Sequence, residues 1–325
     1  MIRLCIAGTS GHYESVLEAI DANPGRYELV GFIPSDASVD AVEHERLFGI
    51  LPHFENYEEM LNEASPDIVV VCSYNHLHAE MAIKALERDI NVYCEKPLTI
   101  NLEDYYALEA AYKASKAKVG AMLECRFSPD FYSAYTAVKN GAVGKVRMLD
   151  ARKSYKLGTR PWHYHKRKTY GSTICWVGIH LIDLLYWISG ERFTDVFARH
   201  SALDNFGHGE LESTATASFS MTGGVLASMT CDYYRPGGAP THGDDRIRIV
   251  GTQGIIEVMN DKCTLIDLNG QRDLPCTSPH NCFEDFVRLT QNEPDIILSS
   301  EDSLYATKVA LQVCSSADTE SLVRF

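Results

Sequence analysis

The segment Glu95, Lys96 and Pro97 places an acid, an amine and a proline directly after an apolar run at residues 90–94. The run is short and rich in β-branched and aromatic residues, as in a buried strand of a parallel sheet. Pro97 cannot continue that strand, because proline lacks an N–H group. Glu95 and Lys96 are therefore expected at the carboxyl end of a strand, where open α/β sheets bind ligands. A charged pair there is either a solvated strand end or part of a site, and the surrounding chain decides between them.

A second candidate site is the turn at residues 8–11, which lies between an apolar run and an amphipathic helix pattern. A strand, a glycine turn and a helix together direct backbone N–H groups at a phosphate. The dinucleotide motif G-x-G-x-x-G is incomplete here, because Ser10 and Tyr13 replace two of its glycines. Asp36, which follows the next strand-like run, is placed to bind a ribose 2′-hydroxyl. The turn alone is also compatible with a connection that binds nothing.

Strand and helix patterns alternate as far as residue 123. Strands are expected at 2–7, 28–33, 67–72, 90–94 and 119–123. Helices are expected between them, with Asn56 and Asn101 as N-caps. Repeated βα units build a parallel, doubly wound sheet. Its carboxyl edge would collect the segments 8–11, 73–78 and 95–97 together with Asp36.

After about residue 124 the pattern changes to longer strands separated by turns. They are expected at 145–155, 215–220, 225–232, 246–250, 254–258 and 263–267. Helices are expected at 129–140, 173–189, 282–291 and 300–316. Alternating polar and apolar residues indicate an antiparallel sheet. We therefore predict a first domain at 1–122 and an α+β domain at 123–325.

The overall composition is that of an ordinary globular protein, with 45% hydrophobic and 23% charged residues. A net charge of −14 argues against nucleic acid and anionic membranes as partners. The ten cysteines contain no CxxC pair, which favours reduced thiols. The chain begins on a strand-like run rather than a leader, so we expect a cytoplasmic protein with no membrane partner.

Four segments resemble the Gfo/Idh/MocA family of sugar and polyol dehydrogenases. They are SPDIVVVCSYNHLHAEMAIKALERDINVYCEKP at 65–97, ECRFSP at 124–129, GIHLIDLLYWISG at 178–190 and RIRIVGTQGIIEV at 246–258. The resemblance implies an N-terminal Rossmann domain and a C-terminal α+β domain with an open, mostly antiparallel sheet. It also implies bound NAD or NADP, a carbohydrate-like substrate, and homodimers or homotetramers built through those sheets.

The same resemblance implies roles for individual residues. Lys96 would hydrogen-bond the reacting alcohol oxygen, and His180 would accept its proton as general base. The implied cofactor site consists of Gly8, Ser10, Gly11, His12, Asp36, Ser73, Asn75, His78, Glu95, Lys96, Pro97 and Arg126. No Arg or Lys follows Asp36 closely enough to hold a 2′-phosphate, which favours NAD over NADP.

The catalytic helix departs from the family pattern. The family often has an Asp one turn before the catalytic His, and this chain has Trp176 there, at i,i+4 from His180. Asp183 is not expected to replace the missing acid. Either Lys96 and His180 suffice, or a tyrosine such as Tyr155 or Tyr233 contributes, or the reaction differs.

The segment 152–170 is rich in Lys, Arg and aromatic residues and contains no acid. It is either a solvated surface or a funnel for an acidic or phosphorylated substrate, since Arg binds carboxylates and aromatic faces stack on sugars. The expected substrate contacts are Lys96, Tyr155, Arg160, Trp162, His163, Trp176, His180 and Tyr233. His163 and His165 lack a third ligand at a suitable spacing, so no metal is expected.

These observations predict an NAD(P)-dependent oxidoreductase that acts on a CH–OH group of a sugar, polyol or derivative. Two alternatives remain open at this point. One is a dinucleotide-binding sensor without turnover, which Trp176 keeps in consideration. The other is a glycosidase or epimerase that reduces and reoxidises its NAD within one cycle.

Overall fold

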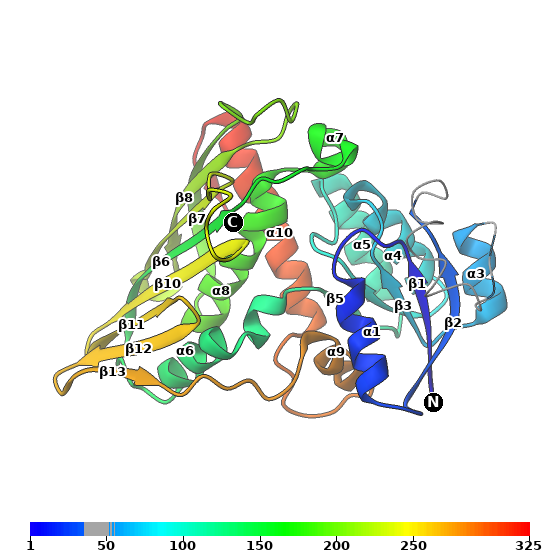
Figure 1. Ribbon diagram of the computed structural model, residues 1–325, viewed down its shortest axis with the longest axis horizontal. Helices are drawn as coiled ribbons and strands as arrows, with labels where there is room; N and C mark the ends of the chain where they lie inside the picture. The colour runs from blue at the N-terminus through cyan, green and yellow to red at the C-terminus, as the bar shows by residue number, and fades with distance from the viewer. Residues whose placement is uncertain (36–51, 53, 55) are drawn as a thin grey trace. The chain divides into compact units, whose positions relative to one another are not determined.

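The computed structural model describes residues 1–35, 52, 54 and 56–325. The chain divides into two compact units, each made of two stretches of sequence. The first unit consists of Met1–Met122 and Cys282–Thr307, and the second of Leu123–Asn281 and Lys308–Phe325. Figure 1 shows the elements of both units.

The first unit is built on a parallel sheet of five strands in the order β2-β1-β3-β4-β5. The strands are β1 (Ile2–Ala7), β2 (Tyr27–Ile33), β3 (Ile68–Val71), β4 (Asn91–Cys94) and β5 (Val119–Ala121). Its helices are α1 (Tyr13–Ala22), α3 (Tyr57–Ala64), η1 (Asn75–Leu77), α4 (His78–Leu86), α5 (Leu102–Ala114) and α9 (Cys282–Thr290). All four residues of β3 are buried, as expected for a strand with both faces covered. The predicted doubly wound parallel sheet is confirmed.

The predicted second domain at 123–325 is wrong for one stretch, because Cys282–Thr307 packs within the first unit. The ring of Phe283 on α9 lies 5.3 Å from the ring of Tyr93 on β4. The hydroxyl of Ser300 accepts a hydrogen bond of 3.2 Å from the first N–H of β5. These contacts join residues that are distant in sequence, and local patterns do not reveal them.

The second unit contains a sheet of nine strands in the order β13-β12-β11-β10-β6-β9-β8-β7-β14. The strands are β6 (Val146–Tyr155), β7 (Phe193–Ser201), β8 (Thr214–Met221), β9 (Leu226–Asp232), β10 (Gly243–Gly251), β11 (Gly254–Met259), β12 (Lys262–Asp267), β13 (Gly270–Leu274) and β14 (Val323–Arg324). Neighbouring strands are antiparallel except β6 and β9, which are parallel. The predicted mostly antiparallel sheet is confirmed.

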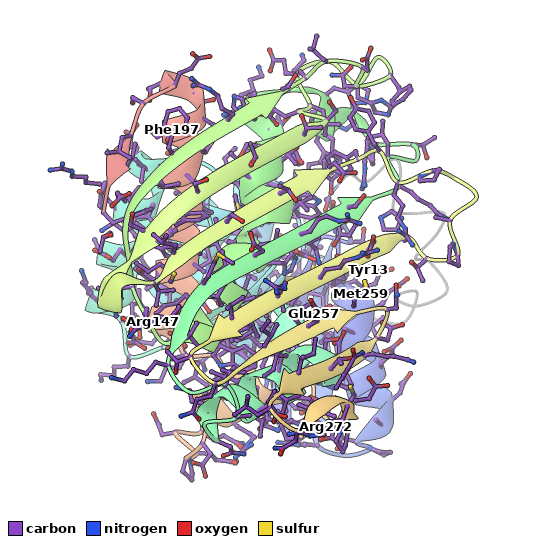
Figure 2. All side chains as sticks on the ribbon, turned by 90° about the vertical axis from the view of Figure 1, so that its left-hand side faces the viewer. Tyr13, Arg147, Phe197, Glu257, Met259 and Arg272 are labelled. Atoms are coloured by element: carbon purple, nitrogen blue, oxygen red, sulfur yellow. The ribbon has the colours of Figure 1, made fainter. Side chains whose placement is uncertain are left out.

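Helices cover one face of this sheet, and the other face is open (Figure 2). The remaining elements are η2 (Glu124–Phe127), α6 (Pro129–Lys139), η3 (Trp162–His165), α7 (Arg167–Tyr170), η4 (Ile174–Gly178), α8 (Ile179–Ser189), η5 (Thr222–Gly224) and α10 (Ser300–Thr319), which spans both units. Residues Arg167–Ser189 are long and apolar enough to cross a membrane, yet 94% of an 18-residue window of that stretch is buried inside the protein. A core helix has the same composition, and α8 packs against β6.

Side-chain caps fix the starts of two helices in the first unit. The carboxamide oxygen of Asn56 accepts a hydrogen bond from Glu59 N, and that of Asn101 accepts one from Asp104 N, both at 2.9 Å. Both caps were predicted from the sequence. They satisfy N–H groups that have no partner within the helix.

Replacing Asn101 by Ala removes the acceptor and should lower the free energy of unfolding by about 1 kcal/mol. Asn101→Asp keeps the oxygen and serves as the control. Urea denaturation of the three proteins measures the difference. A variant with Ala that is as stable as the one with Asp would show that the cap contributes nothing.

Candidate functional site

The turn after β1 packs so closely against neighbouring backbone that only glycine fits at position 8. Gly8 has a φ of +87°, and a Cβ atom there would lie 2.5 Å from the carbonyl oxygen of Cys72. The N–H of Gly8 donates to Ile33 O at 2.7 Å, and that of Ser10 donates to Cys72 O at 2.7 Å. The turn is thereby held against the ends of β2 and β3, and α1 begins directly after it.

Glu95 joins this turn to the end of β4. Its side chain is fully buried, and one carboxylate oxygen accepts the backbone N–H of His12 at 2.8 Å and also contacts the imidazole Nδ1 of that residue. The other oxygen accepts the N–H of Lys96 at 3.0 Å. Burial by itself would raise the pKa of Glu95, but the charge and hydrogen bonds of His12 and the charge of Lys96 lower it to about 2. The carboxylate is therefore ionised at neutral pH, and it holds the turn after β1 to the chain after β4.

Lys96 follows β4, as predicted, and is 3% exposed. The peptide bond between Lys96 and Pro97 is cis. His78 is fully buried, and its two ring nitrogens lie 2.8 Å from Pro97 O and 2.9 Å from Ser73 O. His78 thus fixes the chain after β3 to the chain after β4. Both ring nitrogens of His78 contact backbone carbonyl groups, and its predicted contact with a cofactor stays a prediction.

These residues fit an NAD-type cofactor. The N-terminus of α1 follows the glycine turn, and among the described residues the buried hydroxyl oxygen of Ser73 has no hydrogen-bond partner. Backbone N–H groups at a helix start suit a pyrophosphate, and an unsatisfied hydroxyl suits a polar ligand. Asn75 is also buried nearby in η1. Asp36, the predicted ribose ligand, lies outside the described residues.

In the second unit, the predicted general base His180 lies on α8 and is 6% exposed. Trp176 lies in η4, which is a π-helical turn rather than the α-helix that was expected. A π turn is wider than an α turn, and the i,i+4 relation expected between Trp176 and His180 spans the junction of this turn with α8 and stays a prediction. Such turns often occur at functional sites.

Asp183 forms a buried ion pair with Arg126. Arg126 donates to its two carboxylate oxygens at 2.9 and 2.6 Å, and both side chains are buried. The guanidinium also lies 5.4 Å from the ring centre of Trp187. A bidentate pair of this kind anchors η2 to α8. It supports the expectation that Asp183 does not replace the missing acid, and it gives Arg126 a structural role beside the predicted one.

Several predicted substrate residues form one aromatic cluster. The guanidinium carbon of Arg160 lies 5.0 Å from the ring centre of Tyr233 and 5.6 Å from that of Tyr164. The ring centres of Tyr164 and Trp176 are 5.5 Å apart in an edge-on contact, and those of Tyr155 and Tyr233 are 6.5 Å apart. Trp162 and His163 extend the cluster, His163 buried and Trp162 54% exposed. Burial raises the pKa of Tyr233 to about 12, so its hydroxyl is a hydrogen-bond donor rather than a base at neutral pH.

Sequence analysis missed Lys153 as a candidate residue of this cluster. Leu149, Ala151 and Lys153 are the buried alternate residues of β6, so Lys153 faces the helices. Its ammonium pairs with Asp245 and lies 5.2 Å from the ring centre of Tyr155. Burial opposes its charge, but Cys125, Tyr155 and Asp245 raise the pKa of Lys153 well above its usual range. The strand alternation was a signal that would have identified this buried cation.

Pairing also changes the interpretation of the basic segment 152–170. Arg152 pairs with Asp244, and Arg167 with Glu212 and Asp318, so much of the positive charge is neutralised. Arg160 has only aromatic and backbone contacts among the described residues. Within those residues there is also no group of three metal-ligating side chains.

Substitution of Glu95 tests whether its ionised carboxylate stabilises the fold. The pKa of Glu95 is about 2 in the folded chain against an ordinary value of 4.5, so its contribution to stability is present above pH 4.5 and is lost as the pH falls through 2. Glu95→Gln should lower the free energy of unfolding at pH 7 by roughly 3 kcal/mol. At pH 3, urea denaturation should show a smaller difference in the free energy of unfolding between Glu95→Gln and the unmodified protein.

Glu103→Gln, which alters an exposed carboxylate on α5, is the matched control and should leave the free energy of unfolding unchanged at both pH values. If Glu95→Gln lowers the free energy of unfolding equally at pH 3 and pH 7, the charge of Glu95 does not stabilise the fold.

Comparison with known proteins agrees with this geometry. Residues 2–122 match the family described as an oxidoreductase family with an NAD-binding Rossmann fold, and residues 131–257 match the GFO/IDH/MocA C-terminal domain.

Individual relatives are more distant. The uncharacterized oxidoreductase YrbE of Bacillus subtilis is 27% identical over 70% of this chain and 65% of its own length. Myo-inositol 2-dehydrogenase of Thermotoga maritima is 27% identical over 73% of this chain and 70% of its own length. The chain thus spans about two thirds of the length of these relatives.

Among the solved structures that match along the whole chain, one has a high sequence identity. It is a Thermotoga maritima protein named as an oxidoreductase without a stated substrate, and it is 40% identical with a TM-score of 0.95 over 100% of both chains. With both domain models matched in order, this chain belongs to the Gfo/Idh/MocA family of NAD-binding oxidoreductases.

Proposed function

We propose that this protein is an NAD(P)-dependent dehydrogenase that transfers a hydride between a CH–OH group of a sugar, polyol or derivative and a nicotinamide. The observation that carries the proposal is the buried Lys96 beside the buried, hydrogen-bonded Glu95, at the carboxyl end of β4. A myo-inositol dehydrogenase among the relatives supports a polyol-like substrate.

When bound, the nicotinamide accepts or supplies the hydride. Lys96 hydrogen-bonds the alcohol oxygen and stabilises the negative charge that develops on it, which is worth roughly 10²–10⁴ in rate. Glu95 orients the chain at Lys96 through its hydrogen bond to the Lys96 N–H. The N-terminus of α1 offers backbone N–H groups for the pyrophosphate, beside the turn that contains Gly8, Ser10 and Gly11.

His180 accepts the alcohol proton in this proposal. Neutral imidazole is suited to this step near pH 7. The usual acid one turn earlier is replaced by Trp176, and Asp183 is bound to Arg126. Tyr233, whose pKa is raised to about 12 by burial, serves as a hydrogen-bond donor to the substrate rather than as a second base.

Arg160 supports an acidic derivative as substrate. Its guanidinium is held between the rings of Tyr164 and Tyr233, and a carboxylate could bind it while the aromatic faces contact a sugar ring. NAD rather than NADP is proposed because residues 34–45 contain no Lys or Arg to bind a 2′-phosphate. We also propose a cytoplasmic location.

Replacing Lys96 by Met tests the assignment. Turnover should fall by roughly 10²-fold or more, because a group needed in the transition state is removed, while NAD binding is retained. A panel of polyols, sugars and uronic acids with NAD or NADP, followed by absorbance of the reduced cofactor, measures turnover. Calorimetry measures binding.

Lys116→Met alters an exposed lysine of the same unit and is the control. Unchanged turnover in Lys96→Met would remove Lys96 from the mechanism. Dinucleotide binding without any turnover in the unmodified protein would favour a sensor, and conversion of a glycoside without net reduced cofactor would favour an NAD-assisted glycosidase or epimerase.

We further propose a homodimer or homotetramer formed through the open face of the nine-stranded sheet. Phe197 and Met259 project from this face in Figure 2, and both are 40% exposed. Met148 and Leu226, on the paired strands β6 and β9, are 38% and 58% exposed. Apolar side chains gathered on one open face are typical of a protein interface.

Leu226→Glu should shift the protein toward the monomer, because it would bury a charge in that interface. Light scattering after size-exclusion chromatography measures the mass. Leu268→Glu, in the turn between β12 and β13, is the control. An unmodified protein that is monomeric at micromolar concentration would overturn this proposal.

A further inference from the structure

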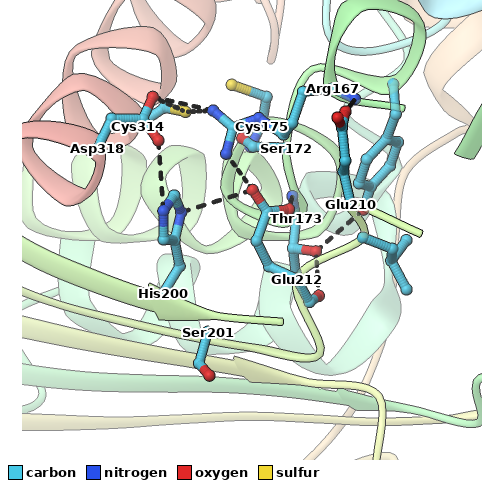
Figure 3. A network of polar contacts seen from close by, with 12 residues as sticks. Arg167, Ser172, Thr173, Cys175, His200, Ser201, Glu210, Glu212, Cys314 and Asp318 are labelled. Carbon is cyan, nitrogen blue, oxygen red and sulfur yellow. Dashed lines mark hydrogen bonds and ion pairs between the residues drawn. The ribbon is translucent and has the colours of Figure 1, made fainter. Parts of the chain in front are cut away.

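Buried carboxylates occur in both units, and their partners differ in one respect. In the second unit, Glu212 is 3% exposed and pairs with Arg167, whose guanidinium stays charged in proteins (Figure 3). In the first unit, the fully buried carboxylate of Glu95 pairs with the imidazole of His12. An imidazole gains and loses its proton near neutral pH, so the charge of this second pair depends on pH.

His12 lies between the turn after β1 and the first residue of α1. Its backbone N–H donates to Glu95 at 2.8 Å, and its Nδ1 contacts the same carboxylate oxygen. The side chain of His12 is 47% exposed, although its partner is fully buried. One edge of the ring therefore touches a buried negative charge, and the ring is also accessible to solutes.

The pyrophosphate of the proposed dinucleotide would bind at the same turn. Ser73 is 1% exposed, and its hydroxyl oxygen has no hydrogen-bond partner among the described residues. It lies beside the turn, because a Cβ atom at Gly8 would be 2.6 Å from the Cα atom of Ser73. A buried hydroxyl of this kind indicates a polar ligand. A pyrophosphate is negative, so the charge of Glu95 would repel it unless cations compensate.

Two cations act on the Glu95 carboxylate. Burial would raise the pKa of Glu95, but the charge and hydrogen bonds of His12 and the charge of Lys96 lower it to about 2. Glu95 is therefore ionised throughout the neutral and mildly alkaline range. The attraction is mutual, so the ionised carboxylate favours the protonated form of the His12 imidazole.

Other titratable groups lie near this turn. Burial lowers the pKa of His78 and raises the pKa of Cys94 well above its usual range, so both side chains are neutral between pH 7 and pH 9. Lys96 and the exposed Glu14 of α1 are the other charged neighbours within the described residues. Substitution of His12 alone separates its titration from theirs.

We propose that the protonated imidazole of His12, held by Glu95, contacts the pyrophosphate of the bound dinucleotide, so that binding weakens as His12 loses its proton. The imidazolium offsets the charge of Glu95 and attracts the pyrophosphate. After loss of the proton, the charge of Glu95 is no longer offset by His12. The identity of the ligand rests on the proposed function, and the dependence of its binding on pH goes beyond it.

Titration of the full-length protein with NADH, measured by fluorescence and by calorimetry, tests the proposal between pH 7 and pH 9. The pyrophosphate of NADH does not titrate in this range, so a change in affinity comes from the protein. The dissociation constant should rise by roughly 5–10-fold from pH 7 to pH 9, as expected for the loss of one charge interaction near a protein surface. At the midpoint of this change, calorimetry in buffers of different ionisation enthalpy should show that binding takes up protons.

Two substitutions separate the charge of His12 from its hydrogen bond. His12→Gln keeps a donor for Glu95 without the charge, so it should bind NADH roughly 5–10-fold more weakly at pH 7 and equally at both pH values. His12→Arg keeps the charge, so it should bind NADH as tightly at pH 9 as at pH 7. His76→Gln alters another imidazole of the first unit, in η1, and is the control that should keep the pH dependence. Thermal denaturation checks that each variant is folded.

The proposal is overturned if the unmodified protein binds NADH equally at pH 7 and pH 9, or if His12→Gln keeps the pH dependence. Failure to bind either NADH or NADPH at both pH values would overturn the proposed function together with this inference. A change in affinity that depends on His12, in a protein without turnover, would support the inference and contradict the dehydrogenase alone.

Discussion

The buried carboxylate of Glu95 is the interaction on which the rest of the first unit's site depends. An ionised carboxylate without solvent is very costly unless its oxygens are paired and hydrogen-bonded. Here the partners are backbone and imidazole groups of His12 and the N–H of Lys96. Gly11 is required beside it, since a Cβ atom there would lie 2.4 Å from a carboxylate oxygen. The positions of the glycine turn and of Lys96 are therefore fixed by the same charge.

The parallel sheet of the first unit could be predicted because the information for its strands is local. Continuous apolar runs such as that of β3, and caps such as Asn101, are each visible within a few residues. The second unit was less predictable. β7 was not predicted although its residues alternate between buried and exposed, and the parallel pairing of β6 with β9 joins strands whose order no local pattern reveals.

The candidate site divides in the same way. The position of Lys96 at a strand end followed from the proline after it. The π turn at Trp176 could not be predicted, because its sequence is equally suited to an α-helix. The alternation of β6 could have identified Lys153 as buried, but its pairing with Asp245, 92 residues away, could not be predicted from local sequence. Ion pairs between distant residues also explain why the basic segment appeared more positive in the sequence than it is in the structure.

The return of Cys282–Thr307 to the first unit limits how this protein can be taken apart. A gene fragment that encodes only residues 1–122 would leave the ring of Tyr93 without Phe283 and the edge of β5 without Ser300. Exchange of the first unit with that of a relative therefore needs three crossover points rather than one. Recombination during evolution faces the same restriction, which favours inheritance of the two halves together.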